Sequence, residues 1–256
     1  MIPFTLSRLE YDVLWSHLGL GPFPTVLRVD GHGRTRGERD ALAVEAWKSL
    51  WDKEYGRPDD LDPALDWCLR VLARPEWEVD ARLHLSADGP RTSALVASRG
   101  GYAVVSTLDA ESLVLRTTEV GAMARTAAAL LPEHPPGPRR STTVPAADLD
   151  EAAGRAGRDA GALVRELQRQ GLANGQAQDI ADVLGAVLRF GQFGVGRTPP
   201  GGRRTRAGHV VSFYDSPAGR FSFTRGRKGT HQWVTLVGTD GHLLARQIDE
   251  LREGLA

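Results

Sequence analysis

The sequence predicts an α+β protein whose single sheet is assembled from two copies of one sheet-plus-helix unit. Residues 92–131 follow the order strand, turn, strand, turn, strand, helix, and residues 207–253 follow the same order. An offset of about 119 residues aligns four pairs of positions: Ser93 with Ser212, Gly100 with Gly219, Tyr102 with Phe221, and Ala129 with Ile248. Few residues are identical between the copies, so the repeat is one of pattern. Such a repeat favours a pseudo-symmetric binding scaffold over a small catalytic domain.

Composition and charge limit the partners that this protein takes. The chain has 256 residues, 41% of them hydrophobic, which suffices for one large domain or two small ones. Its 32 basic and 32 acidic residues give a net charge of zero, which argues against nucleic acid as the main partner. The single cysteine, Cys68, lies in an apolar helical pattern, so neither a disulfide framework nor a thiolate metal site is expected.

No feature of the sequence predicts membrane insertion or export. The N-terminal residues MIPFTLSRLE lack the charged and apolar regions of a signal peptide. No window approaches the roughly 18 consecutive apolar residues that a spanning helix needs. We therefore expect a soluble, cytoplasmic protein.

Three helices are predicted before residue 76. The first starts at the capping-box pair Ser7 and Glu10, and it places four residues on one face: Leu6, Leu9, Val13 and His17. An extended segment, 25–30, leads to a second helix over 38–55. That helix carries a stripe at helical spacing, formed by Ala43, Ala46, Trp47, Leu50 and Trp51. The two tryptophans are interpreted as anchors in a core in preference to a ligand site. Asp62 and Pro63 form the N-cap and first turn of a third, short helix.

Strands dominate the next part of the chain. Residues 77–85 alternate between apolar and polar side chains, which predicts a strand with one buried and one solvated face. Gly100 and Gly101 fit a two-residue hairpin turn, because glycine tolerates the positive φ that such turns need. The run 77–118 is therefore predicted to be an antiparallel meander.

A proline-rich segment divides the chain into two halves. Residues 132–145 hold five prolines and no apolar periodicity, so they are predicted to be a linker. The halves of the repeat are then 1–131 and 146–256 within one domain, 1–256, which we expect to unfold as one cooperative unit. The second half opens with helices over 147–156, 160–171 and 176–189, and a strand begins near Phe190.

The loop 197–208 and the last helix complete the second half. Residues 197–208 are rich in arginine, glycine and proline and lack an apolar anchor, so this loop is expected to be mobile. Its arginines are interpreted as solvated side chains in preference to a site that binds phosphate or an acidic partner. The final helix follows the last strand and buries Leu244, Ile248 and Leu251.

We find no pattern of residues that predicts catalysis. The glycines of 191–196 follow the order G-x-x-G-x-G, whereas a dinucleotide loop has G-x-G-x-x-G between a strand and a helix. The histidines are scattered singly, so no metal site is expected. His209, Ser212 and Asp215 lie close in sequence, but in a strand Ser212 points away from the other two. We expect no catalytic residue, no metal and no cofactor.

At its C-terminal end the sequence resembles the EspG family. The resemblance is carried by residues 191–195, by VVSFYDSPAGRFSF, and by QWVTLVGTDGHLLARQIDELRE. In the N-terminal half it is carried by VLRVDGHG, by a tryptophan-bearing helix, and by LARPEWEVDARL leading into a hairpin. It covers nearly the whole chain and is strongest over 190–253. The arginine-rich composition, with only three lysines, fits an actinobacterial source.

The resemblance implies a fold and a function. The fold is α+β, with a central antiparallel sheet flanked by two helical bundles in a quasi-two-fold repeat. The function is that of a non-enzymatic cytosolic chaperone of type VII (ESX) secretion. Such a chaperone binds the hydrophobic tip of the PPE protein in a PE–PPE heterodimer through the sheet and the C-terminal bundle. It keeps this helical client soluble and delivers it to the secretion machinery.

Two alternatives stay open beside that function. One is a non-secretory scaffold that binds a ligand or a regulator, and the other is an enzyme with a sparse carboxylate or histidine site. The oligomeric state, monomer or weak homodimer, is also open.

The client site is predicted on the open face of the C-terminal sheet. Val211 and Phe213 share one face of their strand, and Phe221 and Phe223 share a face of the next, so these four are assigned to the core. The opposite face then carries the predicted partner-binding residues: Ser212, Tyr214, Arg220, Ser222 and Thr224.

Overall fold

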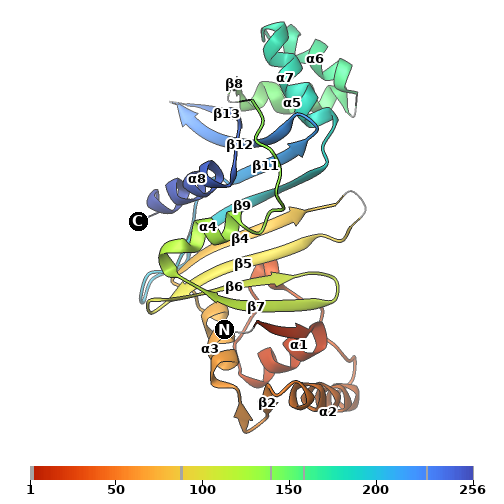
Figure 1. The fold of residues 1–256 in the computed structure, drawn as a ribbon, viewed down its shortest axis with the longest axis vertical. Coiled ribbons are helices and arrows are strands. Elements are labelled where there is room, and N and C mark those ends of the chain that lie inside the picture. The colour runs from red at the N-terminus through yellow and green to blue at the C-terminus, as the bar shows by residue number, and fades with distance from the viewer. Residues whose placement is uncertain (1–2, 87–88, 139, 158, 229, 256) are drawn as a thin grey trace. The chain divides into compact units, whose positions relative to one another are not determined.

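The computed structural model describes residues 3–86, 89–138, 140–157, 159–228 and 230–255. The chain folds as an α+β protein with a large antiparallel sheet, in agreement with the predicted fold class (Figure 1). Contacts divide it into two compact units, which are described in turn. Unit 1 contains Met1–Arg82, Pro90–Thr126 and Gly196–Thr205. Unit 2 contains Leu83–Gly89, Ala127–Val195 and Arg206–Ala256.

The sheet of unit 1 is the predicted meander with one added strand. Its order is β1 (Phe4–Ser7), β7 (Ser112–Thr118), β6 (Tyr102–Leu108), β5 (Thr92–Arg99) and β4 (Trp77–His84). Gly100 and Gly101 join β5 to β6 with φ values of 58° and 83°, as predicted for a hairpin turn. The expected solvated face of β4 is wrong at Glu78 and Asp80, which are 7% and 3% exposed.

The helices of unit 1 before β4 are α1 (Arg8–His17), α2 (Arg36–Asp52) and α3 (Pro63–Ala73); α1 and α3 contact the sheet, and α2 packs against α1. The capping box of Ser7 and Glu10 and the N-cap of Asp62 are present as predicted. Of the four residues predicted to share a face, Leu6 is buried but lies in β1, and Leu9, Val13 and His17 are half-buried or exposed. The core side of α1 is formed by Tyr11, Leu14 and Trp15. A short 3-10 helix, η1 (Thr25–Leu27), replaces the extended start predicted for 25–30.

The apolar stripe of α2 is only partly buried. Ala46 and Leu50 lie in the core, and Trp47 packs against it. Trp51 is 55% exposed and lies 4.9 Å from the Arg57 guanidinium, at the start of the small hairpin β2 (Gly56–Arg57) and β3 (Asp60–Leu61). Trp51 therefore is not the core anchor that the sequence indicated.

In unit 2 the strand order is β9 (Arg189–Arg197), β11 (Val211–Ser216), β12 (Gly219–Lys228), β13 (His231–Gly238) and β8 (Ser141–Pro145). Directly opposite residues of an antiparallel pair share a face. Ser212 lies opposite Phe223, and Phe213 lies opposite Ser222. One face therefore carries Ser212, Tyr214, Phe221 and Phe223, and the other carries Val211, Phe213, Ser222 and Thr224.

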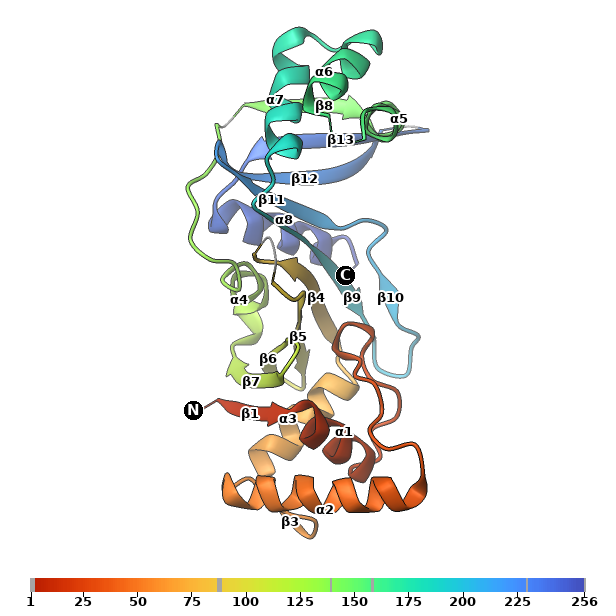
Figure 2. The ribbon, with the colours of Figure 1, turned by 90° about the vertical axis from the view of Figure 1, so that its right-hand side faces the viewer.

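Helices cover both faces of the unit 2 strands (Figure 2). The bundle of α5 (Ala146–Ala156), α6 (Ala160–Arg169) and α7 (Asn174–Gly185) packs its apolar side on Phe221, Phe223 and Leu236. We call this side of the strands the bundle face. The opposite side, here the α8 face, is covered by α8 (Gly241–Glu253) through Leu244, Ile248 and Leu251, the three residues predicted.

The short η2 (Val120–Ala122) and α4 (Met123–Ala128) follow β7. The elements β5, β6, β7 and α4 therefore follow the same order as β11, β12, β13 and α8: three strands and then a helix. This is the order that the sequence predicted. Whether the two copies are related by a quasi-two-fold axis stays a prediction, as does the division into halves 1–131 and 146–256.

The predicted linker 132–145 is structured over much of its length. Residues 141–145 form β8, which pairs with β13. Residues 132–138, here called the strap, bind the β12 backbone: the Arg220 amide donates to the Pro135 carbonyl over 2.7 Å, and the Gly137 amide donates to the Arg220 carbonyl over 2.9 Å. Proline lacks an amide donor, but its carbonyls accept normally. Prolines alone therefore do not make the segment a free linker.

The loop 197–208 has polar attachments. Within it, β10 (Thr205–Arg206) pairs with β9. The Arg204 Nε donates to Glu78 Oε1 over 2.8 Å, which explains how Glu78 is tolerated in a buried position. The expected mobility of the loop stays a prediction.

Among the described residues, no helix is long and apolar enough to cross a membrane.

Candidate functional site

The five predicted site residues do not share one surface. Ser212 and Tyr214 lie on the bundle face, whereas Arg220, Ser222 and Thr224 lie on the α8 face. The prediction assumed that Phe221 and Phe223 share a face with Phe213. The actual register places Phe221 opposite Tyr214 and Phe223 opposite Ser212. A one-residue difference in register exchanges the two faces of a strand, so this assumption reversed β12.

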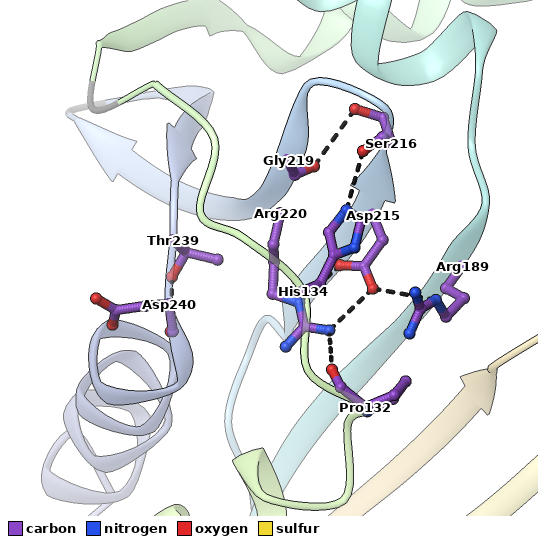
Figure 3. A network of polar contacts seen from close by, with 9 residues as sticks. All are labelled: Pro132, His134, Arg189, Asp215, Ser216, Gly219, Arg220, Thr239 and Asp240. Atoms are coloured by element: carbon purple, nitrogen blue, oxygen red, sulfur yellow. Dashed lines mark hydrogen bonds and ion pairs between the residues drawn. The ribbon is translucent and has the colours of Figure 1, made fainter.

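Arg220 and Ser222 are also buried, at 4% and 0% exposure, so neither belongs to an open face. The Arg220 guanidinium binds Asp215 through two bonds, Nε to Oδ1 at 2.6 Å and Nη2 to Oδ2 at 2.9 Å (Figure 3). Its Nη2 also donates to the Pro132 carbonyl of the strap over 2.8 Å. A buried guanidinium is stable only when its donors are paired, and Arg220 satisfies that condition with the strap and its own hairpin.

Two neighbours extend this network. Arg189 Nε lies 3.5 Å from Asp215 Oδ2, and His134 Nε2 lies 2.9 Å from the Ser216 carbonyl oxygen (Figure 3). The network therefore joins β9, β11, β12 and the strap. Its arginines are structural, and it offers no group to a client at the surface.

An aromatic patch remains on the bundle face, where the helices do not cover it. We define this patch by its residues: His84, Leu188, Phe190, Ser212 and Tyr214. Phe190 lies opposite Tyr214 across β9 and β11, with ring centroids 6.4 Å apart. The His84 ring stacks on Phe190 at 4.4 Å and 9°. Leu188 and Phe190, two positions apart in sequence, are 46% and 42% exposed, so two large apolar side chains are accessible to solvent.

Tyr214 joins the exposed patch to the core of the bundle. Its ring meets Phe223 edge-on at 4.8 Å, and it packs against the cluster formed by α5, α6 and α7. Burial raises the pKa of the Tyr214 phenol, and the smaller opposing effect comes from the charge of Arg225. The phenol therefore stays protonated near neutral pH and keeps a hydrogen-bond donor at the edge of the patch.

Of the patch residues, Ser212 and Tyr214 were among those predicted for the client site, and Leu188, Phe190 and His84 were not. The signal was present, because Phe190 alternates with the buried Gly191 and precedes Phe193, which is 0% exposed. Two phenylalanines three residues apart fall on opposite faces of a strand, so one of them had to leave the α8 face. What the sequence did not reveal is where the bundle ends along the strands.

The grouping of His209, Ser212 and Asp215 does not form a triad in this geometry. Asp215, one member of the His209, Ser212 and Asp215 group, is fully buried and bound to Arg220. Ser212 lies on the opposite face from Asp215. In the part of the chain that the structure describes, no three His, Cys, Asp or Glu residues gather as a metal site.

Comparison with known proteins gives a family and a fold. A model of the EspG family matches residues 7–250. The comparison with curated proteins finds no match. Among solved structures, the chain is similar to the Mycobacterium tuberculosis type VII secretion system chaperone EspG5, solved in complex with a PE25–PPE41 dimer. The TM-score is 0.79 at 14% identity, over 98% of this chain and 96% of that one. At that identity the structural likeness establishes the fold.

Proposed function

The chain belongs to the EspG family, and we propose that it is a cytosolic chaperone of type VII secretion that binds a PE/PPE-like helical client. The aromatic patch carries this proposal, because it leaves two large apolar side chains exposed beside a helical bundle. Exposed apolar side chains that adjoin one another are typical of protein interaction sites. EspG5, which shares this fold, was solved bound to a PE25–PPE41 dimer.

The proposed mechanism is masking of an apolar helical tip. The Phe190 ring is stacked between the rings of His84 and Tyr214, at 4.4 and 6.4 Å, so an approaching side chain meets the edges of aligned rings. Full burial of a Phe or Leu side chain contributes about 1.5–3 kcal/mol. Burying the exposed parts of Leu188 and Phe190 therefore supplies a useful share of the affinity, while the client hides its own apolar residues from other chains.

The client contacts are proposed to be the patch residues together with the adjoining bundle. Ser212 and Tyr214 are retained from the predicted set, because both lie on the bundle face and are partly exposed. Arg220 is proposed to act indirectly, since it holds the strap and the β11–β12 hairpin in place. The proposal assigns no covalent chemistry to the protein, so release of the client depends on competition at the secretion machinery.

The test is purification of the tagged protein from its native host, followed by identification of the chains that co-purify. A PE/PPE-like pair is the expected result. Co-expression of that pair with the chaperone should raise its soluble fraction compared with expression alone. A bound small molecule, or a regulator without secretion genes nearby, would instead favour a non-secretory scaffold. The proposal would be contradicted if the protein purified without any partner both from its native host and after co-expression with a PE/PPE-like pair.

A further inference from the structure

A groove on the α8 face of unit 2 has the chemistry of a separate binding site. It is a cavity of about 380 Å³ between the C-terminal end of α8 and strands β11, β12 and β13. The strands contribute Val211, Thr224 and Trp233, and α8 contributes Gln247, Glu250 and Leu251. These residues lie on the opposite face of the strands from the aromatic patch, so a client on the bundle face leaves the groove uncovered.

The groove combines an apolar wall with hydrogen-bond acceptors. Val211 and Leu251 are 1% and 6% exposed and form part of its wall, together with the Trp233 ring. Gln247 Oε1 is buried, and no hydrogen-bond donor reaches it among the described residues. The Glu250 carboxylate lies one helical turn further along the same side of α8. A buried acceptor without a donor is unfavourable, so Gln247 would gain from a ligand that donates once its side chain turns the enclosed Oε1 toward the groove.

The negative charge at the groove comes from Glu250 and from the C-terminal end of α8. α8 ends at Glu253, and the C-terminal end of a helix carries a partial negative charge. His209 also lines the groove, whereas Arg225, which borders it, directs its side chain to the bundle face opposite Val234. The Arg225 guanidinium is engaged by Asp150, at 2.9 and 3.3 Å. Glu250 has Arg246 at 3.5 Å, with both side chains more than half exposed, so solvent screens that pair.

We propose that this groove binds a guanidinium group on an aliphatic stem, such as an arginine side chain. Trp233 would lie under the planar cation, since tryptophan is the ring that attracts cations best. The fork of a guanidinium donates in two directions at once, which suits acceptors from both Gln247 and Glu250. The aliphatic stem would pack on Val211 and Leu251. The source of the group is either free arginine or an arginine within a partner's chain, and the two are separable by experiment.

The test is an NMR titration of the full ¹⁵N-labelled chain with N-acetyl-arginine amide. The Trp233 indole signal, assigned with Trp233→Phe, and the Gln247 side-chain amide should shift in a saturable way. The matched control ligand is N-acetyl-citrulline amide, which has the same shape without the charge. It should bind at least roughly fivefold more weakly, the size of one modest ionic contact. Equal binding of the two ligands, or no saturable shift with either, overturns the proposal.

Substitutions on α8 then locate the site. Glu250→Gln and Gln247→Met should each weaken arginine binding roughly fivefold. Glu253→Gln is the control, because Glu253 is exposed on the same helix and does not line the groove. An unchanged affinity in both groove variants, with spectra that show an intact fold, also overturns the proposal. Stronger binding of a capped Gly-Arg-Gly peptide than of free arginine identifies a partner's chain as the source, and the reverse identifies the free amino acid.

Discussion

At the residue scale, Cys68 shows how burial sets chemical behaviour. Its thiol is buried in the core of unit 1. Desolvation, with a smaller contribution from the charge of Asp62, raises the pKa of the thiol from 9.0 to about 11. Since the thiolate is the reactive form, the native protein should be nearly inert to a thiol reagent at pH 8. The thiol should become reactive when the protein is unfolded in denaturant. The measurement is the absorbance of a chromogenic thiol reagent, and it reports on Cys68 alone because the chain has a single cysteine.

The same shift gives a pH dependence of stability. Between pH 9 and about 11 the unfolded thiol loses its proton while the folded one keeps it, so the folded state binds more protons. Stability therefore falls as pH rises through this window, and the thiol has no effect on it below pH 9. Cys68→Ala should lose less stability than the parent chain between pH 8 and pH 10.5, as measured by urea denaturation at each pH. Equal losses in the two proteins would contradict this assignment.

Individual residues also show what the sequence could predict. Ser7, Glu10 and Asp62 were assigned correctly because a helix cap is local and depends on the next three residues. Arg220 was misassigned although its carboxylate partner Asp215 is only 5 residues away, because the strap that encloses it includes Pro132, 88 residues away in sequence. The sequence does not distinguish a polar strand residue that is solvated by water from one that is paired with a buried carboxylate.

At the scale of elements, the strap depends on three glycines that approach one another. A Cβ on Gly238 would lie 2.1 Å from the Gly137 carbonyl oxygen, and one on Gly219 would lie 2.5 Å from the Gly137 amide nitrogen. Backbone atoms cannot move aside as a side chain does. The crossing of the strap over β12 and β13 therefore requires glycine at these positions.

This close approach predicts the effect of Gly238→Ala. The added methyl group should lower the free energy of unfolding by about 1–3 kcal/mol, the usual cost of overpacking. Gly226→Ala is the control, because Gly226 lies in the same sheet and its Cβ would meet nothing within 4 Å. It should change stability by no more than about 0.5 kcal/mol. Denaturant titration that finds equal losses for the two variants would show that the strap does not constrain the sheet.

The predicted mobility of the loop 197–208 can be tested by hydrogen exchange, because backbone hydrogen bonds hold its two ends. The Thr198 amide donates to the Glu76 carbonyl over 2.8 Å, and the Ala207 amide donates to the Val195 carbonyl over 3.0 Å. We expect hydrogen exchange to be fast over 200–204 and slower at the two ends. Arg204→Met should speed exchange at Thr198, because it removes the ionic contact with Glu78. Uniform protection of 200–204 in the protein alone would contradict the predicted mobility.

Most elements were predictable because each has a local period or cap. The β5–β6 hairpin and the last helix follow from spacing and turn residues, whereas the helix predicted over 176–189 is α7, which ends at Gly185, four residues early. The pairing of elements was less predictable, since β8 and the strap acquire their structure from β12 and β13. The site shows the same limit. Its strands were predicted, but the register that decides which face each residue occupies was not.

At the scale of the whole molecule, each compact unit is built from three separate segments of the chain. The first half of the sequence, 1–131, lacks Gly196–Thr205, which belongs to unit 1. We therefore expect one cooperative unfolding transition. Proteolysis within 132–145 or 197–208 should not release halves that fold independently. Two separate calorimetric transitions, or a stable fragment 1–131, would show that the halves are autonomous.

The central claim is that the aromatic patch binds the client, and one measurement tests it most directly. The affinity of the purified client pair is measured for the parent chain and for Phe190→Glu. A desolvated, unpaired charge costs a few kcal/mol at an interface, so affinity should fall about 100-fold or more. Tyr102→Glu is the matched control, because Tyr102 is an aromatic residue of unit 1 that is 65% exposed and lies outside the patch. Its affinity should match that of the parent chain. Unchanged binding by Phe190→Glu in a folded protein, or an equal loss in Tyr102→Glu, would contradict the account.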